Sequence, residues 1–379
     1  MQRLLFAFGT RPEAIKLAPV ILHTRQRSND FHVQACVTAQ HRHMLDQVLD
    51  LFSIEPEVDL NLMQPGQDLF DLTARVILGM RSVLRDTRPD WVIVQGDTTT
   101  AWTVALAAFY EGIKVAHVEA GLRTFDKRQP FPEEVNRRLC TQLADLHLAP
   151  TPLSRENLLA ERVGAADIVV TGNPVIDALL WVVERCEHEP PADVLAVQDW
   201  ARRTVRDRRM VLITGHRRES FGQGFMGICT AIAELAAEFR DVCWVYPVHL
   251  NPNVQQPVQK LLGGIPNVHL TDPQTYASFA WLMKRAALIL TDSGGIQEEA
   301  PSLGKRALVM RNTTERPEGV EAGCVKLVGN KRQNIVTSVR EHLTHPELLH
   351  VDPRSNPYGN GQASRKIADA IATRASEKR

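Results

Sequence analysis

Short runs of apolar, often β-branched residues alternate with amphipathic stretches along almost the whole chain. Such alternation is typical of βα units, in which helices pack on a parallel sheet. The pattern predicts a first set of strands at residues 3–8, 32–37, 91–94, 114–118 and 168–170. It predicts a second set at 210–214, 242–246, 288–290, 307–310 and 325–327. We therefore expect an α/β fold.

The length and the gap between the two strand sets indicate more than one domain. A chain of 379 residues corresponds to two or three domains at about 150 residues each. Paired prolines near residue 190 and a charged stretch at 202–209 separate the strand sets, so a domain seam is expected there. The tail places Ala363, Ile367 and Ile371 four residues apart. It should form a helix whose apolar face covers another surface.

The composition of the chain argues against several classes of function. Lys plus Arg and Asp plus Glu both number 44, so the chain has no net charge with which to attract nucleic acid or an anionic membrane. No apolar run approaches the ~20 residues of a membrane helix, and no signal peptide is evident, so a cytoplasmic protein is expected. The six cysteines form no C-x-x-C pair, so we expect buried thiols rather than disulfides or a zinc site.

Ligands of open parallel sheets bind beyond the carboxyl ends of the strands, so the residues that follow each strand are the first candidates. The turn at 9–13 follows the first strand, and its Pro12 suits the first position of a helix. Arg11 and Lys16 would flank that helix N-terminus, which favours binding of a phosphate. The alternative is an ordinary turn whose basic side chains are solvated.

A second phosphate-binding turn is predicted at 291–299. Ser293 can cap the following helix, while Gly294 and Gly295 let backbone N–H groups approach a diphosphate closely. Glu299 would then accept hydrogen bonds from a ribose diol, unless it only belongs to a solvated helix face. Two glycines at a helix start are costly without a ligand or tight packing, which favours the functional interpretation.

Acids and an imidazole follow other strands or turns. Asp97, Glu119 and His216 come after the strands at 91–94, 114–118 and 210–214, and Glu133 follows the turn at Pro132. Each alone can be a helix cap or a surface ion pair. Together they favour acid and base catalysis at the carboxyl ends of the strands.

Two further patterns are weaker. Residues 222–227 match G-x-G-x-x-G, but seven residues separate them from the preceding strand, so nicotinamide binding is not expected. His41, His43 and Asp46 can suggest metal ligands, yet they fall at the start of a predicted surface helix without a second cluster, so no metal site is expected. His249 follows a strand and can line a cleft or cap the backbone, and its spacing does not decide between the two.

The sequence strongly resembles the bacterial non-hydrolysing UDP-N-acetylglucosamine 2-epimerases over essentially its whole length. The motifs that carry the resemblance occur in the same order along the chain, at 8–16, 96–100, 117–124, 131–134, 215–219, 291–303 and 313–318. The resemblance implies a glycosyltransferase-B-like (GT-B-like) fold of two Rossmann-like domains, whose parallel sheets face an interdomain cleft. The expected domains are 1–172 and 173–360, with a C-terminal helix at 361–379 packed back on the first.

The same resemblance implies an activity and a set of site residues. The activity is the interconversion of UDP-GlcNAc and UDP-ManNAc by a homodimer, without metal or nicotinamide cofactor, to supply ManNAc for cell-surface polysaccharide. The residues expected to bind UDP are Arg11, Ser293, Gly294, Gly295, Glu299 and Arg316, with Lys16 nearby and Tyr276 beside the uracil. Those expected around the sugar and the leaving group are Asp97, Glu119, Glu133 and His216. Those that match a second, regulatory UDP-GlcNAc site of some members are Gln40, Gln67, Arg217 and His249.

Several positions depart from the family pattern. Gln95, Asn312, Asn360 and Phe125 replace the more usual His, Asp, Asp and Gly. Gln95 and Asn312 are expected to alter the support around Asp97 and Arg316. His43 and Gly66 remove polar or cationic contacts from the regulatory pattern, so at most weak activation by substrate is expected.

Chemistry restricts the mechanism. The C2–H of an N-acetylhexosamine is not next to a carbonyl, so it cannot be lost and regained as in a racemase. Without a nicotinamide site, the remaining route is elimination of UDP to 2-acetamidoglucal, which has a C1–C2 double bond, followed by re-addition. Two alternatives remain: a glycosyltransferase on the same scaffold, which needs an acceptor site, and a catalytically silent nucleotide-sugar sensor.

Overall fold

The computed structural model describes the 379-residue chain except for residues 39–41, 63, 65, 218–219 and 377–379. Gln40 and His41 thus lie outside the described residues. The chain divides into two compact units, Met1–Ala178 with Tyr358–Arg379, and Leu179–Pro357. We describe each unit by itself.

A parallel sheet is the centre of the first unit. Its strands within the described residues run in the order β3-β2-β1-β4-β5-β6-β7, and every neighbouring pair is parallel. The strands are β1 (Gln2–Phe8), β2 (Phe31–Val37), β3 (Val58–Asp59), β4 (Trp91–Gln95), β5 (Lys114–Val118), β6 (Leu146–Ala149) and β7 (Ile168–Val170). The central strands β1, β4 and β5 are mostly apolar because helices cover both of their faces.

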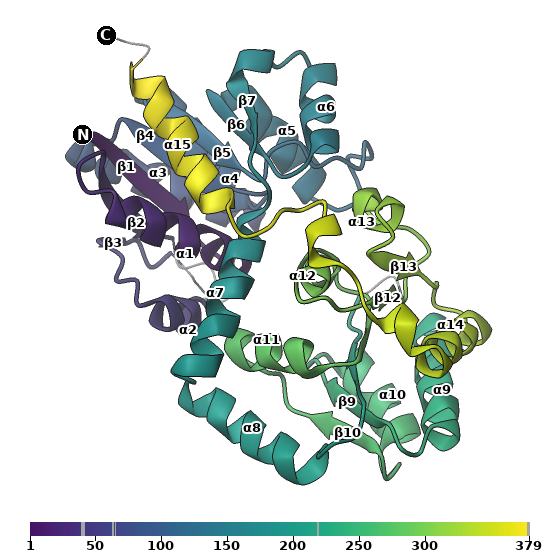
Figure 1. Cartoon of the computed structure of the whole chain (residues 1–379). Coiled ribbons are helices and arrows are strands. Elements are labelled where there is room, and N and C mark those ends of the chain that lie inside the picture. The colour runs from purple at the N-terminus through teal and green to yellow at the C-terminus, as the bar shows by residue number, and fades with distance from the viewer. Residues whose placement is uncertain (39–41, 63, 65, 218–219, 377–379) are drawn as a thin grey trace. The chain divides into compact units, whose positions relative to one another are not determined.

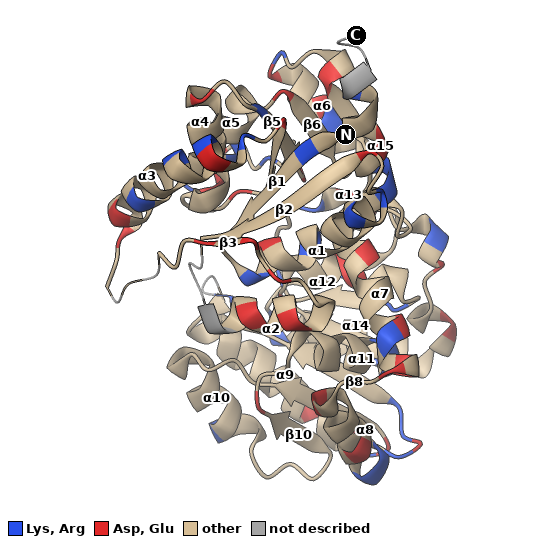
Figure 2. Ribbon diagram, turned by 90° about the vertical axis from the view of Figure 1, so that its left-hand side faces the viewer, with Lys and Arg blue, Asp and Glu red and all other residues tan. Residues whose placement is uncertain are grey.

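Helices pack on both faces of this sheet. They are α1 (Arg11–Gln26), α2 (Arg42–Phe52), α3 (Leu69–Thr87), α4 (Thr99–Tyr110), α5 (Glu133–Leu143), α6 (Pro152–Ala160), the 3₁₀ turn η1 (Ala165–Asp167), the start of α7 (Pro174–His188) and α15 (Ala363–Ser376). Figure 2 shows α3, α4 and α5 on one side of β1 and β2, and α1 and α15 on the other. Residues of β1, β4, α3 and α4 form one continuous apolar core.

The C-terminal segment forms the predicted helix and packs on α1 within the first unit (Figure 1). Ile367 and Ile371 are fully buried, as the spacing of apolar residues predicts. The carboxylate of Asp177 accepts hydrogen bonds from the backbone N–H groups of Ala363 (3.1 Å) and Ser364 (2.8 Å). These bonds satisfy donors that the first turn of α15 otherwise leaves unpaired.

The second unit repeats the same architecture around another parallel sheet. Its described strands run β10-β9-β8-β11-β12-β13, and they are β8 (Met210–Thr214), β9 (Cys243–Pro247), β10 (Val268–Thr271), β11 (Leu288–Thr291), β12 (Ala307–Val309) and β13 (Val325–Leu327). Its helices are the rest of α7, α8 (Ala192–Thr204), α9 (Gln223–Glu238), α10 (Pro252–Leu262), α11 (Tyr276–Arg285), α12 (Gly294–Ser302), α13 (Pro317–Glu321) and α14 (Arg332–Thr344), with 3₁₀ turns η3 (Pro346–Leu349) and η4 (Pro353–Ser355). A buried apolar cluster joins β8, β9 and β11 to α9, α10 and α14.

The sequence pattern missed three strands and misplaced the seam. The missed strands are β3, β6 and β10, which have two to four residues each. The seam expected between 187 and 209 is wrong, because α8 occupies much of this stretch inside the second unit. The division falls instead within α7, between Ala178 and Leu179.

Some predictions from composition can also be compared with the structure. All six cysteines are free and buried, as expected. Figure 2 shows basic and acidic residues interspersed over the helices, consistent with the balanced charge. No helix in the described part of the chain is both long enough and apolar enough to cross a membrane.

The strand order reverses at one point in each sheet. The reversal lies between β1 and β4 in the first unit and between β8 and β11 in the second. In open α/β sheets ligands bind beyond the carboxyl ends of the strands at such a switch point. The turns after β1 and β4, and those after β8 and β11, are therefore the places to look for function.

Candidate active-site residues of the two units

Glu119 is the most heavily bonded carboxylate at the carboxyl ends of the first sheet. It directly follows β5 and has φ +63°, a left-handed conformation that non-glycine residues adopt mainly where the surroundings impose it. Lys16 Nζ lies 2.6 Å from both carboxylate oxygens, Asn173 Nδ2 donates at 3.0 Å, and the amide of Gln95 also donates. These contacts hold the buried Glu119 side chain in one position beside a positive charge.

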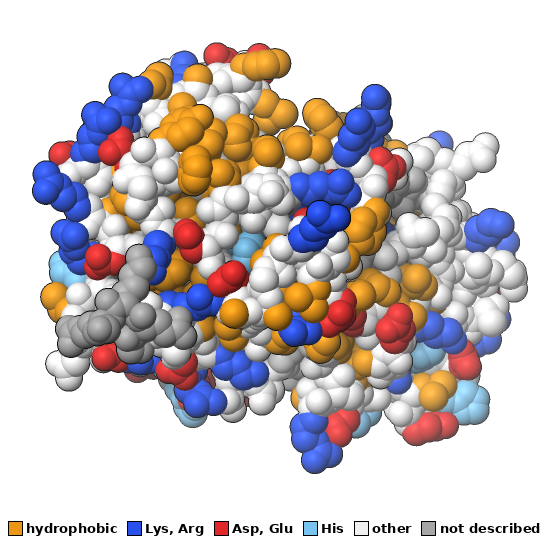
Figure 3. Space-filling view, turned by 90° about the horizontal axis from the view of Figure 1, so that it is seen from above, with side chains coloured by type: hydrophobic (Ala, Val, Ile, Leu, Met, Phe, Trp, Pro, Cys, Tyr) orange, Lys and Arg blue, Asp and Glu red, His pale blue; other side chains and the backbone are white. Residues whose placement is uncertain are grey.

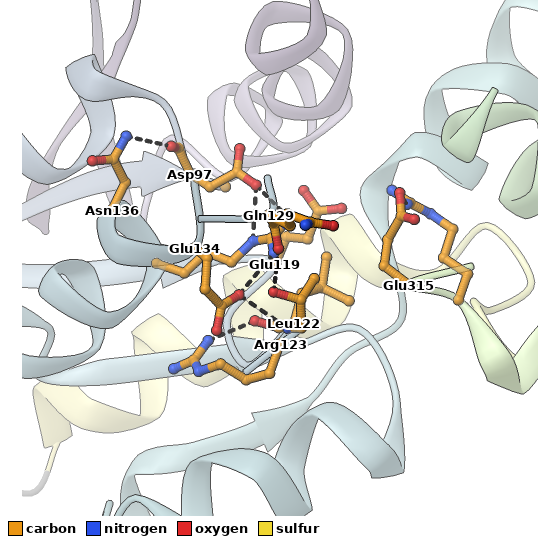
Figure 4. Close-up of polar contacts among 12 residues, drawn as sticks. Asp97, Glu119, Leu122, Arg123, Gln129, Glu134, Asn136 and Glu315 are labelled. Carbon is orange, nitrogen blue, oxygen red and sulfur yellow. Dashed lines mark hydrogen bonds and ion pairs between the residues drawn. The ribbon is translucent and has the colours of Figure 1, made fainter. Parts of the chain in front are cut away.

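Asp97 follows β4 and is held by α5. The Arg137 guanidinium donates to Asp97 Oδ2 from Nε at 2.9 Å and lies 2.8 Å away through a second nitrogen. Asn136 Nδ2 donates to the Asp97 backbone carbonyl at 2.9 Å, a contact drawn in Figure 4. The Asp97 side chain remains 28% exposed, so it is oriented by protein and still accessible.

Glu133 and Glu134 are adjacent acids with different environments. Glu134 is fully buried and accepts hydrogen bonds from the backbone N–H groups of Thr124 (3.0 Å) and Phe125 (3.1 Å) and from Arg137 (3.1 Å). It therefore anchors the loop before α5. The Oε2 atom of Glu133 is buried and has no hydrogen-bond partner among the described residues. Of these two adjacent acids, Glu133 is therefore the one with a carboxylate oxygen that the described residues leave unpaired.

Glu13 connects the turns on the two sides of the switch point. Its side chain is fully buried and accepts hydrogen bonds from the backbone N–H groups of Gly9 (3.0 Å) and Thr10 (2.8 Å) and from Thr98 Oγ1 (2.6 Å). Burial raises the pKa of Glu13, and the hydrogen bonds to Thr98, Thr10 and Gly9 oppose that rise. Arg11 is the first residue of α1, directly beside this junction.

The second unit presents a helix N-terminus and an arginine together. Ser293 occupies the N-cap position of α12, but its side chain makes no capping hydrogen bond within the described residues, contrary to the sequence prediction. The Thr291 hydroxyl instead accepts the N–H of Ser293 at 2.9 Å. A Cβ on Gly294 would lie 2.5 Å from the Arg316 guanidinium, so a larger residue here would displace the arginine. Both the N-terminus of α12 and the cation favour an anion.

Arg316 is held in place by two carboxylates. Its Nε donates to Glu298 and another nitrogen donates to Glu315, and Glu298 is almost fully buried. Burial alone would raise the pKa of Glu315, but Arg316, Arg311 and Arg217 together lower it to about 2. Glu315 is therefore ionised at neutral pH and fixes the orientation of Arg316.

Tyr276 and Glu299 are brought into contact. The Tyr276 hydroxyl donates to Glu299 Oε2 at 3.0 Å, and both side chains are largely buried. The sequence analysis assigned these two residues to the uracil and the ribose of one nucleoside. Their contact satisfies a requirement of that assignment, since base and sugar are adjacent in a nucleoside.

His216 follows β8 and packs against groups from two other strand ends. Its ring stacks on His249, with centroids 5.3 Å apart and planes 15° apart. Its Nδ1 lies 3.5 Å from Oδ1 of Asp292, which is completely buried after β11. Burial lowers the pKa of His216, with Asp292 acting in the opposite direction. His249, whose place the sequence left open, therefore lies at the carboxyl ends of the strands beside His216.

Several residues at the site were not predicted or were given other roles. Gln95 was expected to affect Asp97, but its amide contacts Glu119. Lys16, grouped with phosphate-binding residues, contacts the same carboxylate. Asn173 and Asp292 were missed as partners, although each follows a strand, which is the signal that identified the others. Arg137 gives no such signal, because it lies within α5.

The two weaker sequence patterns have structural explanations or fall outside the site. Cβ atoms on Gly224 and Gly227 would lie 2.8 and 3.1 Å from atoms of Asn330, so these glycines serve close packing of α9. His41 lies outside the described residues, and no group of three or more His, Cys, Asp or Glu suited to a metal occurs in the described part of the chain. Gln67 lies in the first unit, and its Oε1 accepts the N–H of Gln64 at 3.0 Å.

Comparison with known proteins shows the family of this chain. The family model for UDP-N-acetylglucosamine 2-epimerase matches residues 23–372. A protein of that name from Escherichia coli strain K12 is 54% identical over 376 residues, which cover 97% of this chain and 98% of that protein. A crystal structure of UDP-GlcNAc 2-epimerase from Neisseria meningitidis bound to UDP-GlcNAc is 47% identical, covers 98% of this chain and 100% of its own, and has a TM-score of 0.89.

A more distant relative has the same fold. The Methanocaldococcus jannaschii UDP-GlcNAc 2-epimerase in complex with UDP-GlcNAc and UDP is 31% identical, covers 98% of this chain and 99% of its own, and has a TM-score of 0.80. The predicted GT-B-like α/β fold, with two parallel sheets, is thereby confirmed. The chain belongs to the UDP-N-acetylglucosamine 2-epimerase family.

Proposed function

We propose that this chain interconverts UDP-GlcNAc and UDP-ManNAc by eliminating UDP and adding it back. The observation that carries the proposal is the presence, in one chain, of two complementary sets of groups. In the first unit Asp97 and Glu119 follow strands and Glu133 begins α5, and the second unit has a cation beside a helix N-terminus. Carboxylates can move the C2 proton, and the cation and N–H groups can stabilise a departing diphosphate.

In the second unit we assign the nucleotide. Tyr276 would lie beside the uracil, Glu299 would accept hydrogen bonds from the ribose, and Arg316 with the N-terminus of α12 would hold the diphosphate. His216 would lie beside the phosphate that becomes the leaving group. In the first unit, Arg11 at the start of α1 would be a further phosphate-binding cation.

In the first unit we assign the sugar chemistry. Departure of UDP from C1 with loss of the C2 proton gives 2-acetamidoglucal, and protonation of C2 on the opposite face followed by re-addition of UDP gives the epimer. Two faces of the ring require two proton-transfer groups, and Asp97, Glu119 and Glu133 come from three separate turns. Glu133 has an uncommitted buried oxygen, while Glu119 is paired with Lys16, so the acids differ in how readily each accepts a proton.

Solvent exchange at C2 tests the reaction. UDP-GlcNAc is incubated with the enzyme in D₂O and followed by NMR of H1 and H2. We expect UDP-ManNAc with deuterium at C2, because a proton returned by a side chain comes from solvent. Retention of the original hydrogen would reject elimination. A sensor would produce no new sugar, and a glycosyltransferase would release UDP only when an acceptor is present.

We further propose that the enzyme acts as a homodimer in the cytoplasm, where it supplies ManNAc for cell-surface polysaccharide. The dimer is supported by exposed apolar side chains on the outer helices of the first unit: Phe70 (85% exposed) and Leu78 (57%) on α3, and Phe109 (61%) and Tyr110 (67%) on α4. Hydrophobic side chains gather in the upper half of Figure 3. Apolar surface of this kind marks a contact between proteins.

Weak activation by a second UDP-GlcNAc is also proposed. Arg217 and His249, which match regulatory positions, flank His216 at the carboxyl ends of the strands of the second unit. Arg217 Nε is buried without a hydrogen-bond partner among the described residues, so it retains a donor for a ligand. The rate is expected to depend on UDP-GlcNAc almost hyperbolically, and a strongly sigmoidal curve would contradict this.

A further inference from the structure

Only one of the two carboxylate oxygens of Asp292 accepts hydrogen bonds from the described residues. Its Oδ2 accepts the backbone N–H groups of His216 (2.7 Å) and Arg217 (2.8 Å). Its Oδ1 has no hydrogen-bond partner among the described residues, although the side chain is completely buried. A buried carboxylate oxygen without a donor is costly. The ring nitrogen Nδ1 of His216, 3.5 Å away, is placed to become that donor.

This arrangement determines which ring nitrogen of His216 carries a proton. An ionised carboxylate can only accept hydrogen bonds, so Nδ1 facing Asp292 is the protonated nitrogen. Nε2 then presents a lone pair in the neutral ring, which repels a phosphate oxygen. A second proton, on Nε2, converts that lone pair into a charged donor.

The groups around the His216 imidazole shift its pKa in opposite directions. Burial has the largest effect and lowers the pKa of His216, Asp292 raises it, and Arg217 and His249 lower it. The free enzyme therefore has a neutral His216 at pH 7.5. A bound diphosphate would add negative charge on the side opposite to Asp292 and shift the balance toward the imidazolium.

We propose that binding of a nucleoside diphosphate is coupled to uptake of one proton by His216, and that Asp292 is the positioning residue that makes this uptake possible. The proton comes from solvent and adds to Nε2, while Asp292 remains ionised and accepts the Nδ1–H. The imidazolium then donates to the phosphate that leaves C1. This inference rests on the proposed function, because it assumes that the second unit binds UDP.

Isothermal titration of the full chain with UDP at pH 7.5, in buffers of different ionisation enthalpy, measures the protons taken up per UDP. UDP is almost fully ionised at this pH. We expect uptake of at least about half a proton per UDP and approaching one, because an unperturbed imidazole is mostly neutral at pH 7.5, whereas the imidazolium proposed in the complex is mostly charged. His216→Gln removes the titrating ring, so the difference between it and the unaltered chain isolates His216. Any proton taken up by UDP itself is common to both.

Asp292→Asn tests the positioning role. The Asn oxygen can still accept the two backbone N–H groups, while its amide N–H faces Nδ1 and opposes the imidazolium. Uptake should fall below about a fifth of a proton, with UDP still bound. His345→Asn, at an exposed imidazole elsewhere in the second unit, should leave uptake unchanged.

The outcomes separate this inference from the proposed function. Binding of UDP with less than about a fifth of a proton taken up, or with equal uptake by the unaltered chain and His216→Gln, overturns the inference alone. Undiminished proton uptake by Asp292→Asn on binding UDP would show that Asp292 is not the positioning residue for His216. Failure of the unaltered chain to bind UDP overturns both. If Asp292→Asn does not fold, the comparison with His216→Gln still decides whether His216 takes up the proton.

Discussion

The hydrogen-bond partners of single residues distinguish two adjacent acids, Glu133 and Glu134, of which the sequence analysis selected Glu133. Glu134 accepts three hydrogen bonds that hold a loop, whereas Glu133 keeps a buried oxygen without a partner among the described residues. The neutral amide of Gln95 donates to Glu119, opposite the charged Lys16. At the residue scale, function therefore depends on which groups are already satisfied by the protein and which are left for a ligand.

The proposed acids can be tested by removing their charge with little change of shape. Asp97→Asn, Glu119→Gln and Glu133→Gln should each lower kcat by at least ~10²-fold, the usual scale for a lost acid or base, with UDP affinity largely retained. Steady-state kinetics and UDP titration measure the two effects. A variant that lacks only the re-protonating acid should also release 2-acetamidoglucal. Near-normal kcat in all three variants would refute the assignment.

Two further variants serve as comparisons for the three carboxylate variants. Asp126→Asn, at an exposed acid of the same unit, should leave kcat within about twofold. Arg316→Ala should weaken UDP binding first, by about tenfold or more, because it removes a charge-assisted contact to the diphosphate. Weakened UDP binding in the carboxylate variants, with kcat unchanged, would place those acids at the nucleotide instead.

Neighbouring strands place two buried imidazoles opposite each other, which gives stability a pH dependence. His117 on β5 pairs in register with His147 on β6, and both are buried. Burial lowers the pKa of each from 6.5 to about 4. Because the unfolded chain binds these protons at higher pH than the folded chain does, stability is lost as pH falls from about 6.5 toward 4.

The expected loss at pH 5 is up to about 2 kcal/mol per imidazole, from 1.36 kcal/mol per pKa unit. Urea unfolding at pH 7 and pH 5 measures it. In His147→Asn the decrease in the free energy of unfolding from pH 7 to pH 5 should be smaller by up to about 2 kcal/mol than in the unaltered chain. This comparison holds whatever the variant's stability at pH 7. His345→Asn, at an exposed imidazole, should show the full drop. An equal decrease in the free energy of unfolding for the unaltered chain, His147→Asn and His345→Asn would exclude a buried neutral His147.

The packing of α15 on α1 illustrates how one helix face stabilises the first unit. Ile367 is fully buried in this contact, while its neighbour Lys366 is exposed. Ile367→Ala should lower the free energy of unfolding by about 2–5 kcal/mol, the range for a large-to-small change in a core. Lys366→Ala should change it by less than about 0.5 kcal/mol. Urea titration compares the two, and a similar small effect for both would contradict the packing.

At the scale of the whole molecule, the exposed apolar residues of α3 and α4 are the basis for the proposed dimer. Phe70→Asp combined with Phe109→Asp places two charges on this surface, and should shift the mass measured by analytical ultracentrifugation from two chains to one. Leu250→Asp, on a 66% exposed leucine of the second unit, should leave the mass unchanged. A dimer that survives the double substitution would place the interface elsewhere.

The sequence by itself determined the α/β class, most of the strands, the C-terminal helix and the turns proposed to carry function, because these depend on local periodicity and on residues that follow strands directly. Only the tertiary structure decided which side chains contact one another. Lys16 and Glu119 are 103 positions apart in the chain, and Asp292 and the His216 N–H group are 76 apart. Such pairings depend on which strands lie side by side, and on the burial that leaves some polar atoms satisfied and others free.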